Sequence, residues 1–446
     1  MLSMYKPDTA TVHPCGKLSG SLAVPGDKSI SHRVGMLASI SAGISRVQGY
    51  LNSSDCVGLL RAMEALGACT MRSKDDGFAI HGTGKKILEP SGALDLGNSG
   101  TAMRLLTGLL SGFSTPVTLS GDESLRSRPM RRIEEPLRRM GARIQLTGER
   151  GCAPLRVNGG NLKAIEYEMP MASAQVKSAI MLAALFAKGT TTIIEPAPTR
   201  DHTEQVLRML GLPVRVDGLT ISVEGFGPEG PPLKARSWSI PGDISSAAFW
   251  LVAVAANRRS SVTIRGVGLN PRRTAILGVL ERMGAKLKVH MDKNARDGEP
   301  VGEVRVSGTR LKGTVIGGEE IPNLIDEIPI LAVAGALAEG ETVIKDAAEL
   351  RVKESDRIQS ICQSLTALGV ECEEMEDGMR IVGPATIHAP RKPLPSFGDH
   401  RIAMSLAVLG MFADEPLTIR GVECIETSYP GFWDHLKGLG GHVEQY

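Results

Sequence analysis

The chain has 446 residues, of which 42% are hydrophobic and 22% are charged. This composition is typical of a globular protein, and the length predicts two domains or an array of repeats rather than one core. A formal net charge of +2 and an aromatic content of 4% argue against nucleic-acid binding, which needs clustered basic and stacking aromatic side chains. The near-neutral net charge is still compatible with binding of small anionic ligands, since these require positive charge only locally.

The location of the protein is predicted from its thiols and its apolar runs. The seven cysteines are scattered without CxxC spacing, which favours free thiols in a reducing compartment over disulfides or a zinc site. Residues 1–17 lack the apolar core of a signal peptide, and runs such as 179–187 are too short to span a bilayer. We therefore expect a cytoplasmic protein with no membrane partner.

Six segments along the chain share one pattern, an amphipathic stretch that ends in an apolar residue and a glycine, followed by alternating residues. The pattern predicts a helix with a glycine C-cap and then a strand. Its recurrence, roughly every 70 to 85 residues, predicts six α/β units. The six glycines are Gly67, Gly141, Gly211, Gly284, Gly369 and Gly440.

Six apolar segments rich in small residues alternate with these glycines, and most are followed by a β-rich stretch. Because they are apolar on nearly every side, we expect buried helices. Each unit then has the order strand, buried helix, strand, exposed helix, strands, and the six units form two similar lobes. The buried helices are expected to begin near Ser29, Ser99, Ser173, Ser245, Asp326 and His400.

The candidate functional residues lie mainly at the starts of the buried helices. Any single Ser or Asp there could be no more than an N-cap, but a helix N-terminus also binds anions through its free N–H groups and its dipole. Several such ends facing one cleft predict an anion-binding pocket. Full positive charges at the same ends come from Lys28, Arg33, Arg104 and Arg401.

Three loops supply further charge. In 126–132 most arginines are expected to be solvated, but Arg128 precedes Pro129, which can start a helix and fix its direction. In 199–204, His202 has the character of a structural residue. In 351–357, Lys353, Glu354 and Arg357 stand at helical spacing, so the segment is either part of a site or a surface salt-bridge ladder.

Taken together in this order, these motifs resemble the 5-enolpyruvylshikimate-3-phosphate synthase family over essentially the whole chain. The matching motifs are PGDKSISHR (25–33), GNSGTAMR (97–104), SRP (127–129), SAQ (173–175), RVKESDR (351–357) and DHRIAM (399–404). SAQVK and RDHTE (200–204) resemble the class II subgroup. The sequence departs from the family pattern at Thr427, where many relatives carry lysine. It departs from the class II pattern at Arg272, where that pattern has threonine.

The resemblance implies a two-lobed enolpyruvyl transferase fold, an inside-out α/β barrel with six βαβαββ repeats, three in each lobe. The first lobe is inserted, so we expect lobes of 26–241 and of 1–25 plus 242–446, with the active site in the cleft between them. It implies transfer of the enolpyruvyl group of phosphoenolpyruvate to the 5-hydroxyl of shikimate 3-phosphate, in a monomer without cofactor or metal.

The resemblance also assigns residues. Shikimate 3-phosphate is expected to bind Lys28, Ser29, Arg33, Ser173, Gln175, Asp326 and Lys353. Phosphoenolpyruvate is expected to bind Lys28, Gly100, Arg128, Gln175, Arg357 and Arg401. Asp326 is expected to be the base at the 5-hydroxyl, and Glu354, assisted by Lys28, to exchange a proton at the methylene. The neighbouring cations favour an ionised Glu354, which leaves the division of roles open. Gly100 predicts sensitivity to glyphosate, which in this family occupies the phosphoenolpyruvate site.

Two other classes of protein share features with this sequence. Enzymes that transfer enolpyruvyl to UDP-N-acetylglucosamine share the six-unit architecture, but they typically show a Lys–Asn pair near the first helix and a loop cysteine. The corresponding stretches here, 27–33 and 121–130, contain neither. A non-catalytic repeat protein that binds anions or RNA through 126–139 is disfavoured by the near-neutral charge. Phosphate release from phosphoenolpyruvate only with shikimate 3-phosphate present distinguishes the three.

Overall fold

The computed structural model describes residues 7–73, 77–292 and 298–446. Residues 1–6, part of the stretch without a signal-peptide core, lie outside them. The described residues group into two compact units. The inserted unit comprises 26–240 and 298–299, and the flanking unit comprises 7–25, 241–292 and 300–446. Each unit has its own apolar core.

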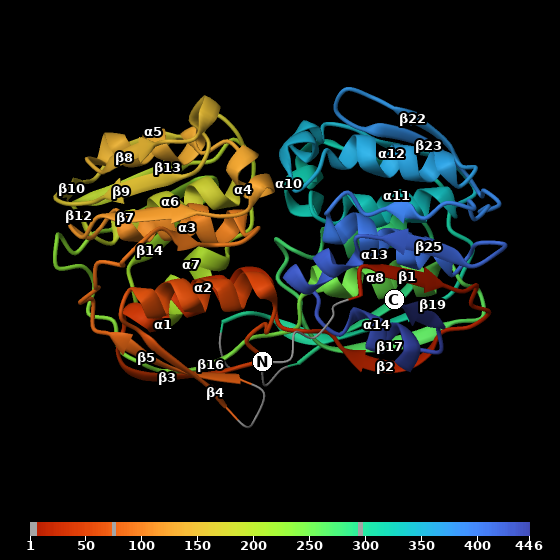
Figure 1. Ribbon diagram of the computed structural model, residues 1–446, viewed down its shortest axis with the longest axis horizontal. Helices are drawn as coiled ribbons and strands as arrows, with labels where there is room; N and C mark the ends of the chain where they lie inside the picture. The colour runs from red at the N-terminus through yellow and green to blue at the C-terminus, as the bar shows by residue number, and fades with distance from the viewer. Residues whose placement is uncertain (1–6, 74–76, 293–297) are drawn as a thin grey trace. The chain divides into compact units, whose positions relative to one another are not determined.

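The described part of the inserted unit contains three four-stranded sheets. Their strand orders are β16 (Ser237–Ser239), β3 (Ala42–Gln48), β5 (Gly77–Thr83), β4 (Cys69–Ser73); β6 (Leu94–Asp95), β7 (Val117–Ser120), β9 (Leu155–Asn158), β8 (Arg143–Leu146); and β11 (Glu166–Glu168), β13 (Thr190–Ile194), β15 (Thr220–Glu224), β14 (Val214–Asp217). A small pair adds β10 (Leu162–Lys163) and β12 (Ala187–Lys188). The helices are α1 (Lys28–Ile40), α2 (Ser54–Ala65), α3 (Gly100–Leu110), α4 (Glu123–Ser127), α5 (Arg131–Met140), α6 (Ala174–Ala184) and α7 (His202–Met209). Helices α3 and α6 pack side by side, and α1 contacts α3 (Figure 1).

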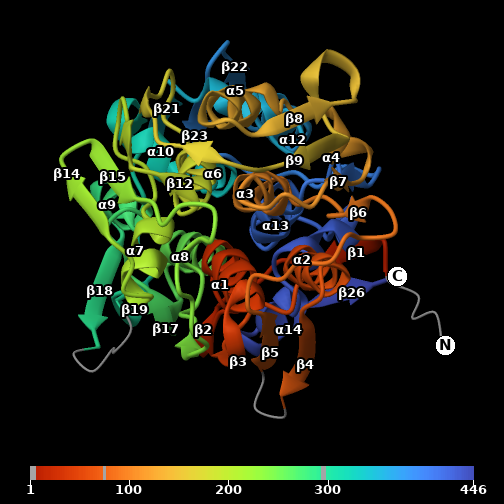
Figure 2. The ribbon, with the colours of Figure 1, turned by 90° about the vertical axis from the view of Figure 1, so that its left-hand side faces the viewer.

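The described part of the flanking unit repeats this plan with three further four-stranded sheets. Their strand orders are β18 (Lys286–Met291), β19 (Val301–Ser307), β17 (Ser261–Gly268), β2 (Ser19–Ala23); β20 (Val315–Ile316), β21 (Gly340–Ile344), β23 (Met379–Gly383), β22 (Glu371–Glu374); and β24 (Leu394–Pro395), β25 (Leu417–Arg420), β1 (Thr9–Val12), β26 (Val443–Gln445). Figure 2 shows β18, β19, β17 and β2 in that order. The helices are α8 (Ile244–Ala255), α9 (Ala275–Arg282), α10 (Ile321–Leu324), α11 (Ile328–Ala336), α12 (Arg357–Ala367), α13 (His400–Gly410) and α14 (Phe432–Gly438). Helices α8, α11 and α13 pack against one another.

All six four-stranded sheets have the same pairing: one edge strand is parallel to its neighbour, and the other neighbours are antiparallel. The parallel pair is the first one in five of the orders above and the last one, β17 and β2, in the sheet β18–β19–β17–β2. The predicted repeat is therefore confirmed. In the last repeat the third strand is β1, from the beginning of the chain, which pairs with both β25 and β26. This pairing ties the N-terminal strand into the flanking unit.

The predicted glycine C-caps are also confirmed. All six repeat glycines have positive φ, between 73° and 108°, a conformation in which a side chain is strained. The predicted buried helices form as well, with one shift: α11 begins at Ile328, two residues beyond Asp326. The short helix α10 ends at Leu324, so Asp326 lies in the turn between two helices rather than at a helix start.

Candidate active site

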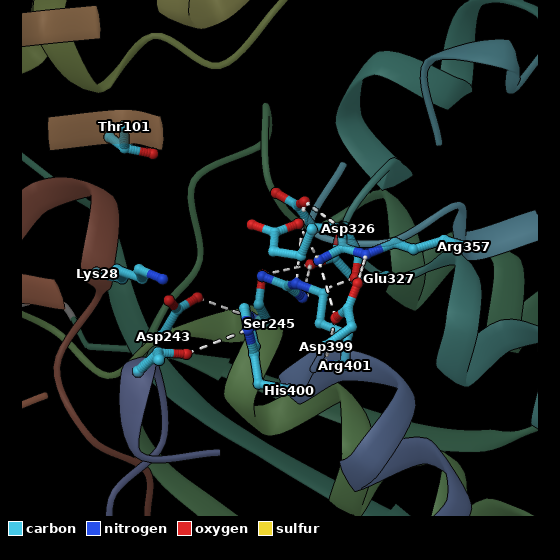
Figure 3. Close-up of polar contacts among 12 residues, drawn as sticks. Lys28, Thr101, Asp243, Ser245, Asp326, Glu327, Arg357, Asp399, His400 and Arg401 are labelled. Atoms are coloured by element: carbon cyan, nitrogen blue, oxygen red, sulfur yellow. Dashed lines mark hydrogen bonds and ion pairs between the residues drawn. The ribbon is translucent and has the colours of Figure 1, made fainter. Parts of the chain in front are cut away.

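Arg357 is the centre of a charged cluster in the flanking unit. It is the first residue of α12, whose N-cap Asp356 accepts a hydrogen bond from the Gln359 amide at 3.0 Å. Its buried guanidinium donates to both oxygens of Asp399, from Nε at 2.8 Å and from Nη2 at 3.3 Å. Nη2 also donates to Glu354 at 2.6 Å, and Nη1 donates to Asp326 at 3.3 Å. Figure 3 shows Asp326, Asp399 and Arg357 converging, although they come from separate segments.

The charge of Arg357 is fixed by these partners. Burial alone would lower the pKa of its guanidinium, but Asp399 and Glu354 outweigh that effect and the pKa is raised. The sequence left open whether 351–357 is a surface salt-bridge ladder. That alternative is wrong for Arg357, because its partners surround a buried side chain.

Arg401 joins the same cluster from the first turn of α13. Its Nη1 donates to the backbone oxygen of Asp326 at 2.6 Å, and its Nε lies 3.9 Å from Asp326 Oδ1. The N-cap of α13 is Asp399, which accepts from the Arg401 amide at 2.9 Å. One carboxylate therefore both caps the helix that carries Arg401 and holds the guanidinium of Arg357.

Lys353 and Glu354 lie between the 3-10 helix Ala348–Val352 (η3) and α12, so the helical spacing of 353, 354 and 357 does not reflect one continuous helix. Burial lowers the pKa of the Lys353 ammonium, and the nearby carboxylates of Asp326 and Glu349 oppose that shift only in part. Lys353 thus releases a proton more readily than an ordinary lysine.

A second polar cluster, which the sequence did not predict as a group, lies at the start of α8. The Ser245 hydroxyl donates to the buried carboxylate of Glu327. Arg273 Nη2 donates to Ser245 at 2.7 Å and to Asp243, the N-cap of α8, at 3.2 Å. Arg401 Nη1 lies 3.8 Å from Glu327 Oε1 and links this cluster to the first one. The segments 241–248 and 323–329 are prominent in the sequence, but their contact is a tertiary feature.

His400 and Thr427 meet beside the start of α13, with His400 Nδ1 3.3 Å from the Thr427 hydroxyl. Thr427 ends the 3-10 helix Val422–Thr427 (η4). The position where many relatives carry lysine is therefore occupied here by a neutral hydrogen-bonding group.

In the inserted unit, three predicted residues lie at the start of α1. Lys28 Nζ lies 2.5 Å from Asp55 of α2. Arg33 is buried: Nη1 donates to the Ser29 carbonyl at 2.9 Å, Nε to Thr203 at 2.7 Å, and Nη2 to the Ser178 hydroxyl at 2.7 Å. Arg33 thus joins α1 to α6 and α7, and in this conformation its guanidinium faces protein.

A further group of predicted residues surrounds the start of α3. Arg128 Nη2 donates to Asn98 and, at 3.2 Å, to Ser124. A Cβ at Gly100 would lie 3.1 Å from Arg128 Nη1. Glycine therefore lets the helix start approach the arginine closely, since 3.1 Å is tighter than ordinary van der Waals contact.

Gln175 links α6 to α3. Its side-chain nitrogen donates to Thr101 at 2.9 Å, and its side-chain oxygen accepts from Arg104. Ser173 caps α6 by accepting from the Val176 amide at 3.4 Å. The amide of Gln175 is therefore held in a fixed orientation by its two partners.

Two expectations about neighbouring residues have definite outcomes. Pro129 does not start the next helix: α5 begins at Arg131 with Met130 as its N-cap. Arg128 is instead the C-cap of α4, a short helix that the sequence pattern did not predict. His202 is buried at the first position of α7, as expected of a structural residue.

These clusters suit anionic substrates. The planar guanidinium of arginine matches carboxylate and phosphate groups, and the ammonium of lysine is a compact charge that two anionic groups can share. The set of α/β repeats with such helix starts defines an enolpyruvyl transferase fold: the enolpyruvyl transferase NikO from Streptomyces tendae matches with a TM-score of 0.80 over 99% of both chains at 20% identity, which speaks to the fold alone.

The family model described as EPSP synthase (3-phosphoshikimate 1-carboxyvinyltransferase) matches residues 12–436, and the chain belongs to this family. A 3-phosphoshikimate 1-carboxyvinyltransferase of Akkermansia muciniphila is 49% identical over 429 residues, covering 94% of this chain and 97% of the relative. One of Desulforamulus reducens is 45% identical, covering 96% and 98%. The EPSP synthase structure from Acinetobacter baumannii matches with a TM-score of 0.84 and 42% identity over 98% of this chain and all of that one. Within the described ranges, no helix has the length and apolarity needed to cross a membrane.

Proposed function

We propose that the charged clusters of the two units act on one pair of substrates in an addition–elimination reaction. The activity is that of the family: the enolpyruvyl group of phosphoenolpyruvate is transferred to the 5-hydroxyl of shikimate 3-phosphate, and phosphate is released, a step of the shikimate pathway. The hydroxyl oxygen bonds to the central enol carbon and the methylene gains a proton. The tetrahedral intermediate then loses phosphate and a methyl proton. Two lobes, 26–241 and 1–25 with 242–446, would share this chemistry.

The proposed binding roles follow charge and position. Lys28, Ser29, Arg33, Ser173, Gln175, Asp326 and Lys353 would hold shikimate 3-phosphate. Lys28, Gly100, Arg128, Gln175, Arg357 and Arg401 would hold phosphoenolpyruvate. The positive helix starts support both sets, and the forks of Arg128, Arg357 and Arg401 support the phosphoenolpyruvate set.

Asp326 is the proposed base at the 5-hydroxyl. Its Oδ1 lies 3.3 Å from Arg357 and 3.9 Å from Arg401, and both cations favour the ionised form that a base requires. The proton of the attacking hydroxyl would pass to this carboxylate as the new C–O bond forms. The position of the Asp326 carboxylate beside these two arginines is the main observation in support of the mechanism.

Glu354 is the proposed proton-exchange group at the methylene. Its contact of 2.6 Å with Arg357 favours the ionised carboxylate. Accepting the methyl proton during elimination therefore suits Glu354 better than donating in the first step. Lys28 would assist the donation.

The experiment compares Asp326→Asn and Glu354→Gln in single-turnover reactions in deuterated water. We expect each to slow the reaction by about 10²–10⁴-fold, with Asp326→Asn delaying formation of the tetrahedral intermediate. Glu354→Gln should delay its breakdown and reduce exchange of deuterium into the methylene. Glu373→Gln, at an exposed carboxylate of β22, is the matched control. Equal effects of both variants on both steps would contradict the assignment of roles.

The class II subgroup is also proposed, and one contact supports it. Lys177 of the SAQVK motif and Glu204 of the RDHTE motif form a buried ion pair at 2.7 Å, and Lys177 also pairs with Glu195 at 3.0 Å. The subgroup motifs thus meet in the folded unit. Arg272 remains a departure from the subgroup pattern.

The remaining parts of the proposal are a monomeric state and a cytoplasmic location. The seven cysteines are all free, which is consistent with a reducing compartment. Size-exclusion chromatography with light scattering tests the monomer, and a dimer mass would contradict it.

A further inference from the structure

Three potential metal ligands lie on one face of the sheet β24–β25–β1–β26, at its β1–β26 edge. In the antiparallel pair, Ala10 is opposite Gln445, Thr11 opposite Glu444, and Val12 opposite Val443. The next pair is His13 and His442, where the His13 amide donates to the His442 carbonyl at 3.0 Å. Since side chains alternate between faces, His13, His442 and Glu444 project on the same side. Val12 and Val443 point into the core, so this side faces outward.

The three side chains are already close together. His13 Nε2 lies 3.1 Å from Glu444 Oε1, and the two imidazole rings are 4.2 Å apart between centroids. One ligand atom from each residue can be chosen so that all lie within 4.8 Å of one another. A single ion with ligands at about 2.0–2.2 Å fits such a group after small side-chain rotations.

The carboxylate is also held from its other side. The Tyr446 hydroxyl donates to Glu444 Oε2, which leaves Oε1 directed at His13. A metal-ligating carboxylate is commonly fixed by such an outer hydrogen bond, because orientation raises its effectiveness as a ligand. The side chains of His13 and Glu444 are 27% and 45% exposed, so an ion can reach them from solvent.

We propose that His13, His442 and Glu444 form a surface site for a divalent transition metal, with Zn²⁺ as the best match. Two imidazoles and one carboxylate are a ligand set that zinc uses, with water in the fourth position, whereas Mg²⁺ and Ca²⁺ prefer oxygen ligands alone. The site contains none of the proposed substrate-binding residues.

The geometry gives the ion a structural role. It connects the residue after β1 to the residue before β26 and to the middle residue of β26, and so fastens the C-terminal strand to the N-terminal strand within the flanking unit. An ion that binds the folded protein and not the unfolded chain stabilises it by mass action. Zinc should therefore stabilise this sheet without altering turnover.

The test uses tag-free full-length protein titrated with ZnCl₂ by calorimetry, with MgCl₂ as the oxygen-preferring control. We expect one zinc per chain, a melting temperature that rises with zinc concentration, and unchanged kcat. His13→Ala and His442→Ala should each weaken zinc binding by roughly tenfold or more and abolish the rise in melting temperature. His388→Ala is the matched control, because His388 also pairs with a carboxylate, Asp414 at 2.7 Å.

The variants separate this site from binding by free thiols elsewhere. Zinc affinity that is equal in wild type, His13→Ala and His442→Ala would overturn the proposal, and so would failure of the wild type to bind zinc. Loss of affinity in His388→Ala equal to that in His13→Ala would also overturn it.

Discussion

Replacing Asp399 with asparagine tests whether one buried carboxylate organises the charged cluster. In the native protein this side chain is 0% exposed, accepts from Arg357 at 2.8 and 3.3 Å, accepts from the Ser355 hydroxyl at 3.2 Å, and caps α13. Asparagine has nearly the same shape and can still cap a helix. It cannot neutralise a guanidinium, so the substitution isolates the charge.

The expected loss of folding stability in Asp399→Asn follows from the burial of the ion pair. Removing one partner of a buried ion pair costs about 3–5 kcal/mol, because the remaining charge is left uncompensated. Glu354 and Asp326 still contact Arg357 in the variant, so we expect the lower end, about 3 kcal/mol. Arg357 should also shift toward these two carboxylates, which raises KM for phosphoenolpyruvate.

Asp356→Asn is the matched control in the same unit. Asp356 also caps a helix and pairs with an arginine, Arg351 at 2.8 Å, but its side chain is 30% exposed. Exposed pairs contribute only about 0.2–1 kcal/mol. Urea unfolding followed by tryptophan fluorescence suits the comparison, since two of the three tryptophans, Trp250 and Trp433, lie in the flanking unit. Equal losses of stability in the two variants would refute the reasoning.

Three other substitutions give measurable outcomes. Gly100→Ala should raise the inhibition constant for glyphosate more than KM for phosphoenolpyruvate, because the methyl group meets Arg128 at 3.1 Å; steady-state inhibition kinetics measure both. Burial lowers the pKa of His32 to about 3, so the unfolded chain binds a proton below about pH 6.5 that the folded chain excludes. The resulting stability is complete above that pH and is lost as pH falls toward 3, by about 1.4 kcal/mol per pH unit. His32→Gln should flatten this dependence in urea unfolding between pH 7.5 and 5. Lys177→Met leaves Glu204 buried without its cation and should destabilise the inserted unit by about 3 kcal/mol, measured by calorimetric melting.

Each of these has a control or a contrary result. Gly58→Ala adds a methyl group that meets nothing within 4 Å, so inhibition should not change, and an unchanged constant in Gly100→Ala would contradict the steric argument. Identical pH slopes in wild type and His32→Gln would exclude that histidine as their source. Lys188→Met, at an exposed lysine, should leave the melting temperature nearly constant, and an equal loss there would count against the buried pair of Lys177.

The repeat architecture was predictable because its signals are local. Each helix ends at a glycine whose positive φ is required by the cap itself, as at Gly67 and Gly284, with φ of 104° and 89°. The pattern therefore appears in the sequence wherever the structure needs it. The exception, Asp326, lies between two closely spaced helices whose boundary depends on how 321–328 packs.

Contacts between distant segments were not predictable in the same way. His13 and His442 are adjacent only because β1 pairs with β26, and no local pattern joins residues at opposite ends of the chain. The cluster of Ser245, Glu327 and Arg273 has the same origin, since each residue stands in a different motif. A search by ligand spacing in the sequence detects neither group.

The three carboxylates around Arg357 differ in solvent exposure, a difference that their sequence motifs do not reveal. Asp326, Glu354 and Asp399 all contact the Arg357 guanidinium, and each belongs to a conspicuous motif. The side chains of Asp326 and Glu354 are 18% and 17% exposed, whereas that of Asp399 is 0% exposed and directs both oxygens at Arg357. A proton-transfer group must reach the reacting atoms, so Asp399 is a positioning residue. Asp326 and Glu354 retain the access that the proposed base and proton-exchange group require.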